Sequence, residues 1–211
     1  MKQQPNILLI TSDQHRADSL GCAGHSCVQT PHLDQLAYEG TRFENAYANC
    51  PVCIPARTSM ITGIQAHHYG MPSYNEGYRI ERLREQYLGS LITRAGYQTQ
   101  LVGKTHWHTE PSFRGGFEAV SWLSRLQKER LIKTGRPFNP TGIGFNEITP
   151  TLSQLPPELY STDWIVDKSI DFLETREKDL PFFLWTSFTD PHPPFVIHEP
   201  YYSMYDNDYL G

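Results

Sequence analysis

Residues 5–14 read Pro-Asn-Ile-Leu-Leu-Ile-Thr-Ser-Asp-Gln, an apolar run that ends abruptly in polar residues. A short, uninterrupted run of this kind is typical of a strand that is covered on both faces in a parallel sheet. We therefore expect residues 7–11 to form a central strand, with Asp13 and Gln14 in the loop that follows it.

Helix and strand signals alternate along the rest of the chain. Helices are expected where apolar residues at helical spacing are bounded by a proline or a capping hydroxyl near the start, or by a glycine past the end, and strands where short apolar runs lie between turn residues. The expected helices are 31–39, 54–61, 88–95 and 161–174, and the expected strands are 98–102 and 182–188. Ser161 or Thr162 would cap the last helix, whose buried face would hold Trp164, Ile165, Ile170 and Leu173. Residues 111–160, rich in Pro and Gly, are expected to lie over the sheet as an insertion with a short helix at 122–132.

Composition limits the classes of function. The chain has 211 residues, with Lys plus Arg at 18 and Asp plus Glu at 23 for a net charge of −5, and neither sign forms long runs. The length suits one large domain or two small ones, and because no composition break marks a linker, we expect one α/β unit. The charge balance argues against a nucleic-acid partner. The longest early apolar stretch, 7–10, is too short for a secretion signal or a membrane span. We expect a cytoplasmic protein without a membrane partner, or a periplasmic one if a leader has been removed.

Four polar clusters follow, or begin, the expected elements: 13–15, 53–57, 104–106 and 190–192. Three of them come directly after strands. In open parallel sheets the ligand crevice lies at the carboxyl ends of the strands, so these loops are expected to converge on one site.

The most specific cluster is Cys53-Ile54-Pro55-Ala56-Arg57, at the start of an expected helix. The helix N-terminus offers unpaired N–H groups and a positive dipole end to an anion. Arg57 follows one turn later, on the same face as Cys53. Sulfate or phosphate is the anion that this arrangement favours.

With this motif the chain resembles the type I sulfatases of the alkaline-phosphatase superfamily, in which the cysteine of Cys-x-Pro-x-Arg is oxidised to formylglycine. Further matching stretches, in chain order, are 5–14, 20–25, 30–34, 103–106 and 191–195. The resemblance covers essentially the whole chain. It implies an alkaline-phosphatase-like α/β sandwich with a mostly parallel central sheet flanked by helices.

The resemblance also implies hydrolysis of an organic sulfate ester, of a small molecule or a saccharide. The hydrated aldehyde derived from Cys53 would attack sulfur with one oxygen and expel sulfate with the other. Arg57 would stabilise the diol and the sulfuryl charge, and Lys104 would neutralise a sulfate oxygen. His106 would orient or deprotonate the diol, and His192 would lie near the leaving-group oxygen as a hydrogen-bond donor or general acid.

By the same resemblance, Asp13, Gln14 and the modified Cys53 would bind a divalent metal. Ca²⁺ is the expected ion, with Mg²⁺ and Mn²⁺ as alternatives. Many sulfatases have a second carboxylate where this chain has Gln14, and Asp-Gln also occurs in related phosphonate monoester hydrolases. A phosphonate or phosphate ester hydrolase is therefore the alternative, and a formylglycine-generating enzyme is the expected maturation partner.

The family's remaining metal ligands and a second substrate-binding lysine are not found before Gly211. We therefore expect 1–211 to be the N-terminal portion of a truncated catalytic domain, lacking turnover by itself. The noncatalytic alternative is an incomplete, anion-binding fragment with an unmodified Cys53.

Other polar residues have a less specific interpretation. Cys50 and Cys53 form a Cys-x-x-Cys pair, which suggests a redox or zinc module, but no second pair follows. His67 and His68 are expected to be loop residues outside the site. Four residues near the motifs stay without an assigned role: His15, Arg16, His25 and His108.

Overall fold

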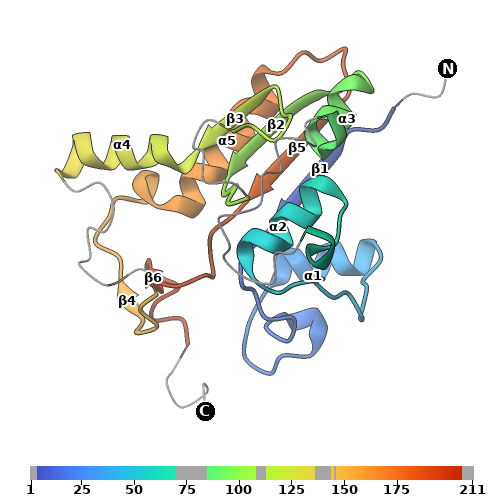
Figure 1. The fold of residues 1–211 in the computed structure, drawn as a ribbon. Helices are drawn as coiled ribbons and strands as arrows, with labels where there is room; N and C mark the ends of the chain where they lie inside the picture. Colours follow the sequence, from blue (N-terminus) through green and yellow to red (C-terminus); the bar gives the residue numbers. More distant parts are fainter. Residues whose placement is uncertain (1–3, 70–84, 108–112, 136–143, 145, 206–211) are drawn as a thin grey trace.

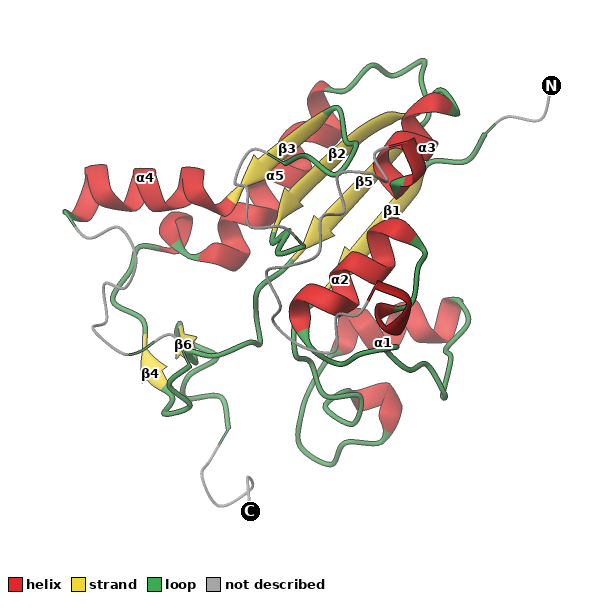
Figure 2. Cartoon of the chain, in the orientation of Figure 1, coloured by secondary structure: helices red, strands yellow, loops and turns green. Residues whose placement is uncertain are grey.

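The computed structural model describes residues 4–69, 85–107, 113–135, 144 and 146–205. Its centre is a parallel four-stranded sheet with the order β1-β5-β2-β3 (Figures 1 and 2). The strands are β1 (Ile7–Thr11), β5 (Phe182–Ser187), β2 (Gln98–Gly103) and β3 (Ala119–Trp122). Because every pair is parallel, the carboxyl ends of all four strands lie at the same edge of the sheet.

Helices pack on both faces of this sheet. Because successive residues of a strand point to opposite faces, one strand contributes side chains to both layers of packing. From β5, Phe183 and Trp185 pack into one apolar cluster, and Leu184 packs into another. The first cluster includes residues of α2 (Cys53–Thr62) and α3 (Leu88–Arg94). The second includes residues of α4 (Leu123–Thr134) and α5 (Ser161–Thr175). The result is the three-layer α/β architecture expected from the sequence.

The smaller elements surround these layers. They are η1 (Gly21–Ala23), α1 (Pro31–Glu39), η2 (Ala66–Tyr69) and η4 (Pro157–Leu159), together with β4 (Thr151–Leu152), which pairs in parallel with β6 (Val196–Ile197). No helix among the described residues combines the length and the apolar character needed to cross a bilayer.

The prediction of a central first strand is wrong for the residues that the structure describes. There β1 pairs only with β5, at the edge of the sheet. Leu8 and Ile10 are 49% and 55% exposed, so one face of β1 is open. The apolar run correctly predicts a strand, but the strands buried on both faces are β5 and, apart from its first residue, β2.

The segment expected as an insertion also contributes to the main sheet. Residues 119–122 form β3, which adds to β2 at the other edge. The short helix expected at 122–132 is α4. A four-residue strand next to a helix has too few residues to show a clear period of two, so the sequence pattern did not reveal it.

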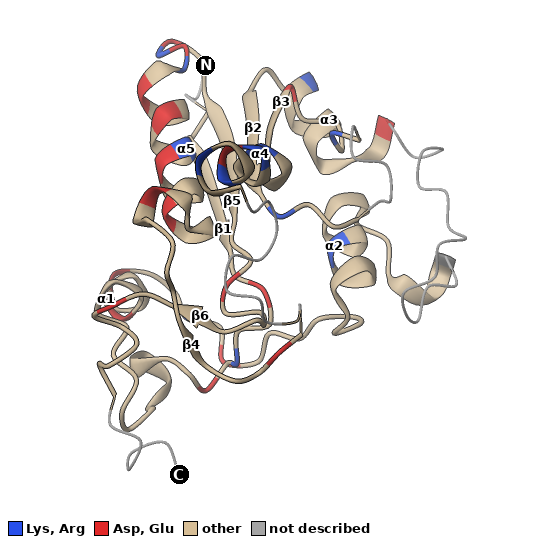
Figure 3. Cartoon of the chain, turned by 90° about the vertical axis from the view of Figure 1, so that its left-hand side faces the viewer, with Lys and Arg blue, Asp and Glu red and all other residues tan. Residues whose placement is uncertain are grey.

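Helix α5 forms as expected, but two details differ. Tyr160 is its N-cap residue, and the hydroxyls of Ser161 and Thr162 donate to Asp190 instead of capping their own helix. Ile170 is 46% exposed and does not share the buried face, where Ser169 lies instead. The opposite face of the helix is acidic, through Asp163, Asp167, Asp171 and Glu174 (Figure 3).

Candidate active site

Three neighbouring strand ends form the base of the candidate site. Asp13 follows β1, Lys104 follows β2, and the loop that carries His192 follows β5. The backbones approach closely here: Lys104 N donates to Ser187 O at 2.9 Å. Gly103 has a φ of +100°, and a Cβ at that position would lie 2.1 Å from Ser187 O. Glycine is therefore required at the end of β2, immediately before Lys104.

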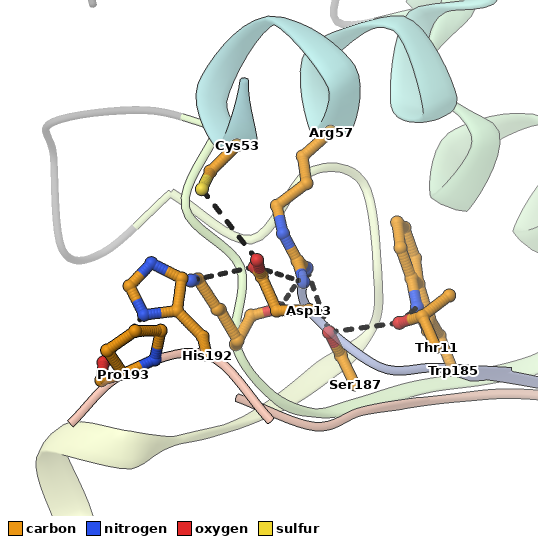
Figure 4. Close-up of polar contacts among 9 residues, drawn as sticks. Thr11, Asp13, Cys53, Arg57, Trp185, Ser187, His192 and Pro193 are labelled. Carbon is orange, nitrogen blue, oxygen red and sulfur yellow. Dashed lines mark hydrogen bonds and ion pairs between the residues drawn. The ribbon is translucent and has the colours of Figure 1, made fainter. Parts of the chain in front are cut away.

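Helix α2 brings two side chains to the same place from above the sheet (Figure 4). Cys53 is its first residue, after an extended Val52, and Arg57 lies one turn later. Positions i and i+4 of a helix share a face, so both side chains point toward Asp13. The helix ends at Gly63, whose φ of 70° permits the left-handed C-cap.

Asp13 links these elements. Its Oδ2 accepts from Lys104 Nζ at 2.7 Å and from Arg57 Nη2 at 3.0 Å, and its Oδ1 lies 3.8 Å from Cys53 Sγ. The Asp13 side chain is only 7% exposed. Burial acts to raise the pKa of Asp13, but Lys104 and Arg57 outweigh it and hold the pKa below its usual range. The carboxylate is therefore charged at neutral pH.

Arg57 is held by a second set of contacts that the sequence did not reveal. Its Nη1 donates to Lys104 O and to Ser187 Oγ, both at 2.9 Å. Ser187 Oγ also accepts from Thr11 Oγ1 at 3.2 Å, which itself accepts from Trp185 Nε1 at 3.0 Å. Thr11 and Ser187 are register partners at the ends of β1 and β5. The available signal was a hydroxyl residue near the end of each of two predicted strands, 7–11 and 182–188.

The two histidines expected in the site are both near Asp13. His106, with a left-handed φ of 49°, has a lowered pKa, first because of burial and then because of the charges of Lys104 and Arg57. Its imidazole is therefore neutral at neutral pH. His192 Nδ1 lies 2.7 Å from Pro193 O, and since a carbonyl only accepts, we assign the proton to Nδ1. Nε2 of His192 is then the nitrogen available to other groups.

Asp13, Cys53 and His192 also form a group that fits a divalent cation. One ligand atom from each lies within 4.8 Å of the others. The ion pairs of Asp13 with the two cationic side chains are made through Oδ2, whereas its Oδ1 is the oxygen nearest Cys53 Sγ. An oxygen in place of the Cys53 sulfur would give a harder donor set, which suits Ca²⁺ or Mg²⁺. His192, expected only beside the leaving group, is thus part of this candidate metal group, whereas the exposed Gln14 remains a predicted ligand.

The remaining polar residues lie in other local contacts. Cys22, Cys27, Cys50 and Cys53 are all thiols rather than disulfides, and Cys50 packs against Ala66. The rings of His67 and His68 lie 4.2 Å apart in η2. Three of the residues left unassigned make contacts within their own loops. His15 contacts Ser12 and Ser19, and Arg16 pairs with Asp18. His25 accepts from the amides of Cys27 and Val28. His108 lies outside the described residues.

Three features together define the alkaline-phosphatase-like class of α/β fold. They are the parallel sheet, the helix that begins at Cys53 and the charged groups at the strand ends. The model of the sulfatase family matches residues 5–210, and the chain belongs to this family.

Individual relatives agree with this assignment. An arylsulfatase of Clostridium perfringens is 33% identical over 98% of this chain and 47% of its own length. An N-acetylglucosamine-6-O-sulfatase of Bacteroides thetaiotaomicron is 30% identical over 97% of this chain and 34% of its own length. The solved phosphonate monoester hydrolase of Agrobacterium radiobacter superposes with a TM-score of 0.73 at 26% identity, covering 96% of this chain and 44% of that enzyme. This chain thus spans less than half the length of each of these proteins.

Proposed function

We propose that the whole protein hydrolyses organic sulfate esters, of small molecules or saccharides, with a formylglycine made from Cys53 and a bound divalent cation, most simply Ca²⁺. The observation that carries the proposal is the position of Cys53. Cys53 is the first residue of α2 and its Sγ lies near Asp13 Oδ1. Arg57 and Lys104 pair with the same carboxylate. A nucleophile position, a metal-binding oxygen and two cations for an anionic ester are therefore in one place.

The divalent cation and the formylglycine have separate tasks in this proposal. The cation would supply Lewis-acid stabilisation of negative oxygen, with Asp13 Oδ1 as a ligand and with Gln14 as a further candidate. The formylglycine hydrate would supply a nucleophilic oxygen and a second oxygen for release of sulfate. A thiol at position 53 has no such second oxygen.

The chain's own side chains bind and orient the ester. Contacts with Lys104 O, Ser187 and Asp13 occupy three of the five N–H groups of Arg57, which leaves others to donate to sulfuryl oxygens. Lys104 would neutralise a sulfate oxygen. Because the lowered pKa of His106 keeps it neutral, it is suited to accept a proton from the nucleophile or to orient it. His192 would serve the leaving-group oxygen as donor or acid when Nε2 also carries a proton.

A phosphonate or phosphate ester hydrolase is the second candidate. Two observations favour it: the Asp13-Gln14 pair, and the TM-score of 0.73 with a phosphonate monoester hydrolase. Sulfate esters and phosphonate monoesters are both singly charged anions, so two cations beside Asp13 accept either. The sulfatase family match and the named sulfatase relatives place sulfate first.

The proposal needs one protein partner, a formylglycine-generating enzyme. The test therefore uses the full-length polypeptide produced together with that enzyme.

We expect a higher kcat/KM for 4-nitrophenyl sulfate than for the 4-nitrophenyl ester of phenylphosphonate. The Cys53→Ala variant should lose turnover of both, because it cannot be matured. A higher kcat/KM for the phosphonate would favour the second candidate, and equal turnover by Cys53→Ala would contradict the assigned nucleophile.

A further inference from the structure

The loop that carries His192 is fastened at both ends to the start of α5. This loop, residues 188–195, leaves β5 and leads to β6. The following inference rests on the proposed function, because it explains how His192 is placed for its role there.

The first fastening holds the beginning of the loop. Asp190 Oδ2 accepts from Thr162 Oγ1 at 2.5 Å and from Ser161 Oγ at 3.3 Å. Both hydroxyls donate to the same carboxylate oxygen, and that of Thr162 is the nearer of the two. The negative carboxylate also lies at the N-terminal end of a 15-residue helix, where the helix dipole favours negative charge. Asp190 is two residues before His192, so its position limits where the imidazole can lie.

The second fastening holds the end of the loop. Tyr160 OH donates to Val196 O at 2.7 Å, and its ring packs edge-on against His198 with centroids 4.5 Å apart. Burial, and next the charge of Asp190, raise the pKa of Tyr160, so its hydroxyl remains a donor at any physiological pH. Pairing of β6 with β4 adds a backbone bond from Thr151 N to Phe195 O.

The helix that provides both fastenings is itself fixed to the sheet. Trp164 and Ile165, in its first turns, are buried in the apolar cluster that includes Leu184 of β5. Ser169 shares a hydrogen bond of 3.0 Å with Thr186. The start of α5 is therefore a rigid support, and a loop attached to it has little freedom to move His192 away from Asp13 and Cys53.

We propose that Thr162 is a positioning residue, which fixes His192 in the site by binding Asp190. Thr162 acts through Asp190 and not by contact with the ester. The sequence offered Thr162 only as a helix cap, and Asp190 only as part of a polar cluster.

Three variants of the full-length, matured protein test this role. Thr162→Val removes the hydroxyl at almost constant volume, and Thr162→Ser keeps it. Thr175→Val is the matched control, because Thr175 is at the far end of the same helix and its hydroxyl binds only the backbone carbonyl of Asp171. Thermal unfolding of each variant verifies that the protein remains folded.

The first readout does not require turnover. In ¹H–¹³C spectra of histidine-labelled protein, His192→Gln identifies the ring signal of His192. We expect Thr162→Val to shift or broaden this signal, and Thr162→Ser and Thr175→Val to leave it in place. An unchanged His192 signal in folded Thr162→Val would overturn the positioning role, whatever ester the protein cleaves.

The second readout is the dependence of kcat on the leaving group. If His192 assists the leaving oxygen, its displacement matters most for esters of poorly acidic alcohols. Thr162→Val should lower kcat for an alkyl or sugar sulfate by roughly 10- to 100-fold and for 4-nitrophenyl sulfate by less than about threefold. Thr162→Ser should restore both rates. Equal losses on both esters would contradict the proposal, whereas failure of wild-type protein to cleave any sulfate would contradict the proposed function alone.

Discussion

Asp13 is the residue whose replacement should affect the site most. Asp13→Asn removes the negative charge but keeps the shape, leaving the buried Arg57 and the partly buried Lys104 without their shared counter-charge. Removing one partner of a buried ion pair costs about 3–5 kcal/mol. We expect a loss of roughly that size in the free energy of unfolding, measured with urea. Asp18→Asn, which breaks the exposed pair with Arg16, is the control and should leave the midpoint unchanged. A wild-type midpoint for Asp13→Asn would contradict this account.

Ser187 is the hydroxyl that fixes Arg57. Ser187→Ala removes the shared acceptor of Arg57 Nη1 and Thr11 Oγ1, in a fully buried place. We expect a stability loss of about 1–3 kcal/mol and a fall in kcat/KM of roughly tenfold, because Arg57 is less well held. Ser121→Ala is the matched control: it removes a buried hydroxyl that accepts from Gln100 Nε2, on β3, a strand that carries none of the assigned site residues. Equal losses of kcat/KM in both variants would show that the effect is general destabilisation.

At the scale of elements, the sequence predicted most of the helices and strands of the main sheet, because prolines, glycines and apolar spacing mark their ends. It did not predict which strand is central. An apolar run such as 7–11 shows that both faces of a strand tolerate apolar side chains, but the neighbours of a strand depend on the path of the whole chain. Likewise, Ser161 and Thr162 have good capping side chains, but a tertiary acceptor, Asp190, competes for their hydroxyls.

The hydrogen bonds of Asp34 join η1 to the start of α1, and their dependence on pH can be tested. Asp34 Oδ1 accepts from Thr30 Oγ1 at 2.8 Å and from Cys22 N at 2.7 Å. The hydrogen bond from Thr30 lowers the pKa of Asp34 most. Burial acts in the opposite direction, but the bond from Cys22 adds to the effect of Thr30, and the pKa lies below its usual value. Its contribution to stability is therefore complete above the unfolded pKa of about 4, and is lost as the pH falls through the lower pKa of the folded state.

We therefore expect hydrogen-exchange protection of the Cys22 amide, corrected for intrinsic rates, to decrease as the pH drops below about 4. In Asp34→Asn this decrease should be absent, because residue 34 no longer titrates. The amide of Gly63, which binds Ser59 O in α2, is the internal reference. Protection of Cys22 that stays constant to lower pH in the wild type would contradict the assigned role of Asp34.

At the scale of the whole molecule, the site is assembled from β1, α2, β2 and the loop after β5, far apart in the chain. The sequence predicted this convergence because parallel strands place their carboxyl ends at one edge. It could not predict that Asp13 also pairs with Lys104 and Arg57, since an ion pair depends on side-chain directions in three dimensions. Nor could it predict the Trp185–Thr11–Ser187 contacts, because hydroxyl residues at strand ends are common.

If the converging loops bind a cation, removing that cation should lower the thermal stability of the protein. A cation bound by the folded site alone stabilises the protein by about 2.7 kcal/mol at a free concentration of 100 times its Kd. We expect a chelator to lower the Tm of the full-length protein, and added Ca²⁺ to restore it. Asp13→Asn, which lacks a ligand charge, should show little change on either addition. An identical response of the variant and the wild type would place the ion elsewhere.

The central claim is that Cys53 becomes the nucleophile of a sulfate ester hydrolase. Peptide mass spectrometry of the protein purified from its native host tests this claim most directly, because the aldehyde differs in mass from the thiol and is trapped by hydrazides. We predict that the peptide containing Cys53 carries formylglycine, and that the modified fraction follows sulfate ester turnover across preparations. An intact thiol at Cys53 in a preparation that hydrolyses sulfate esters would contradict the account.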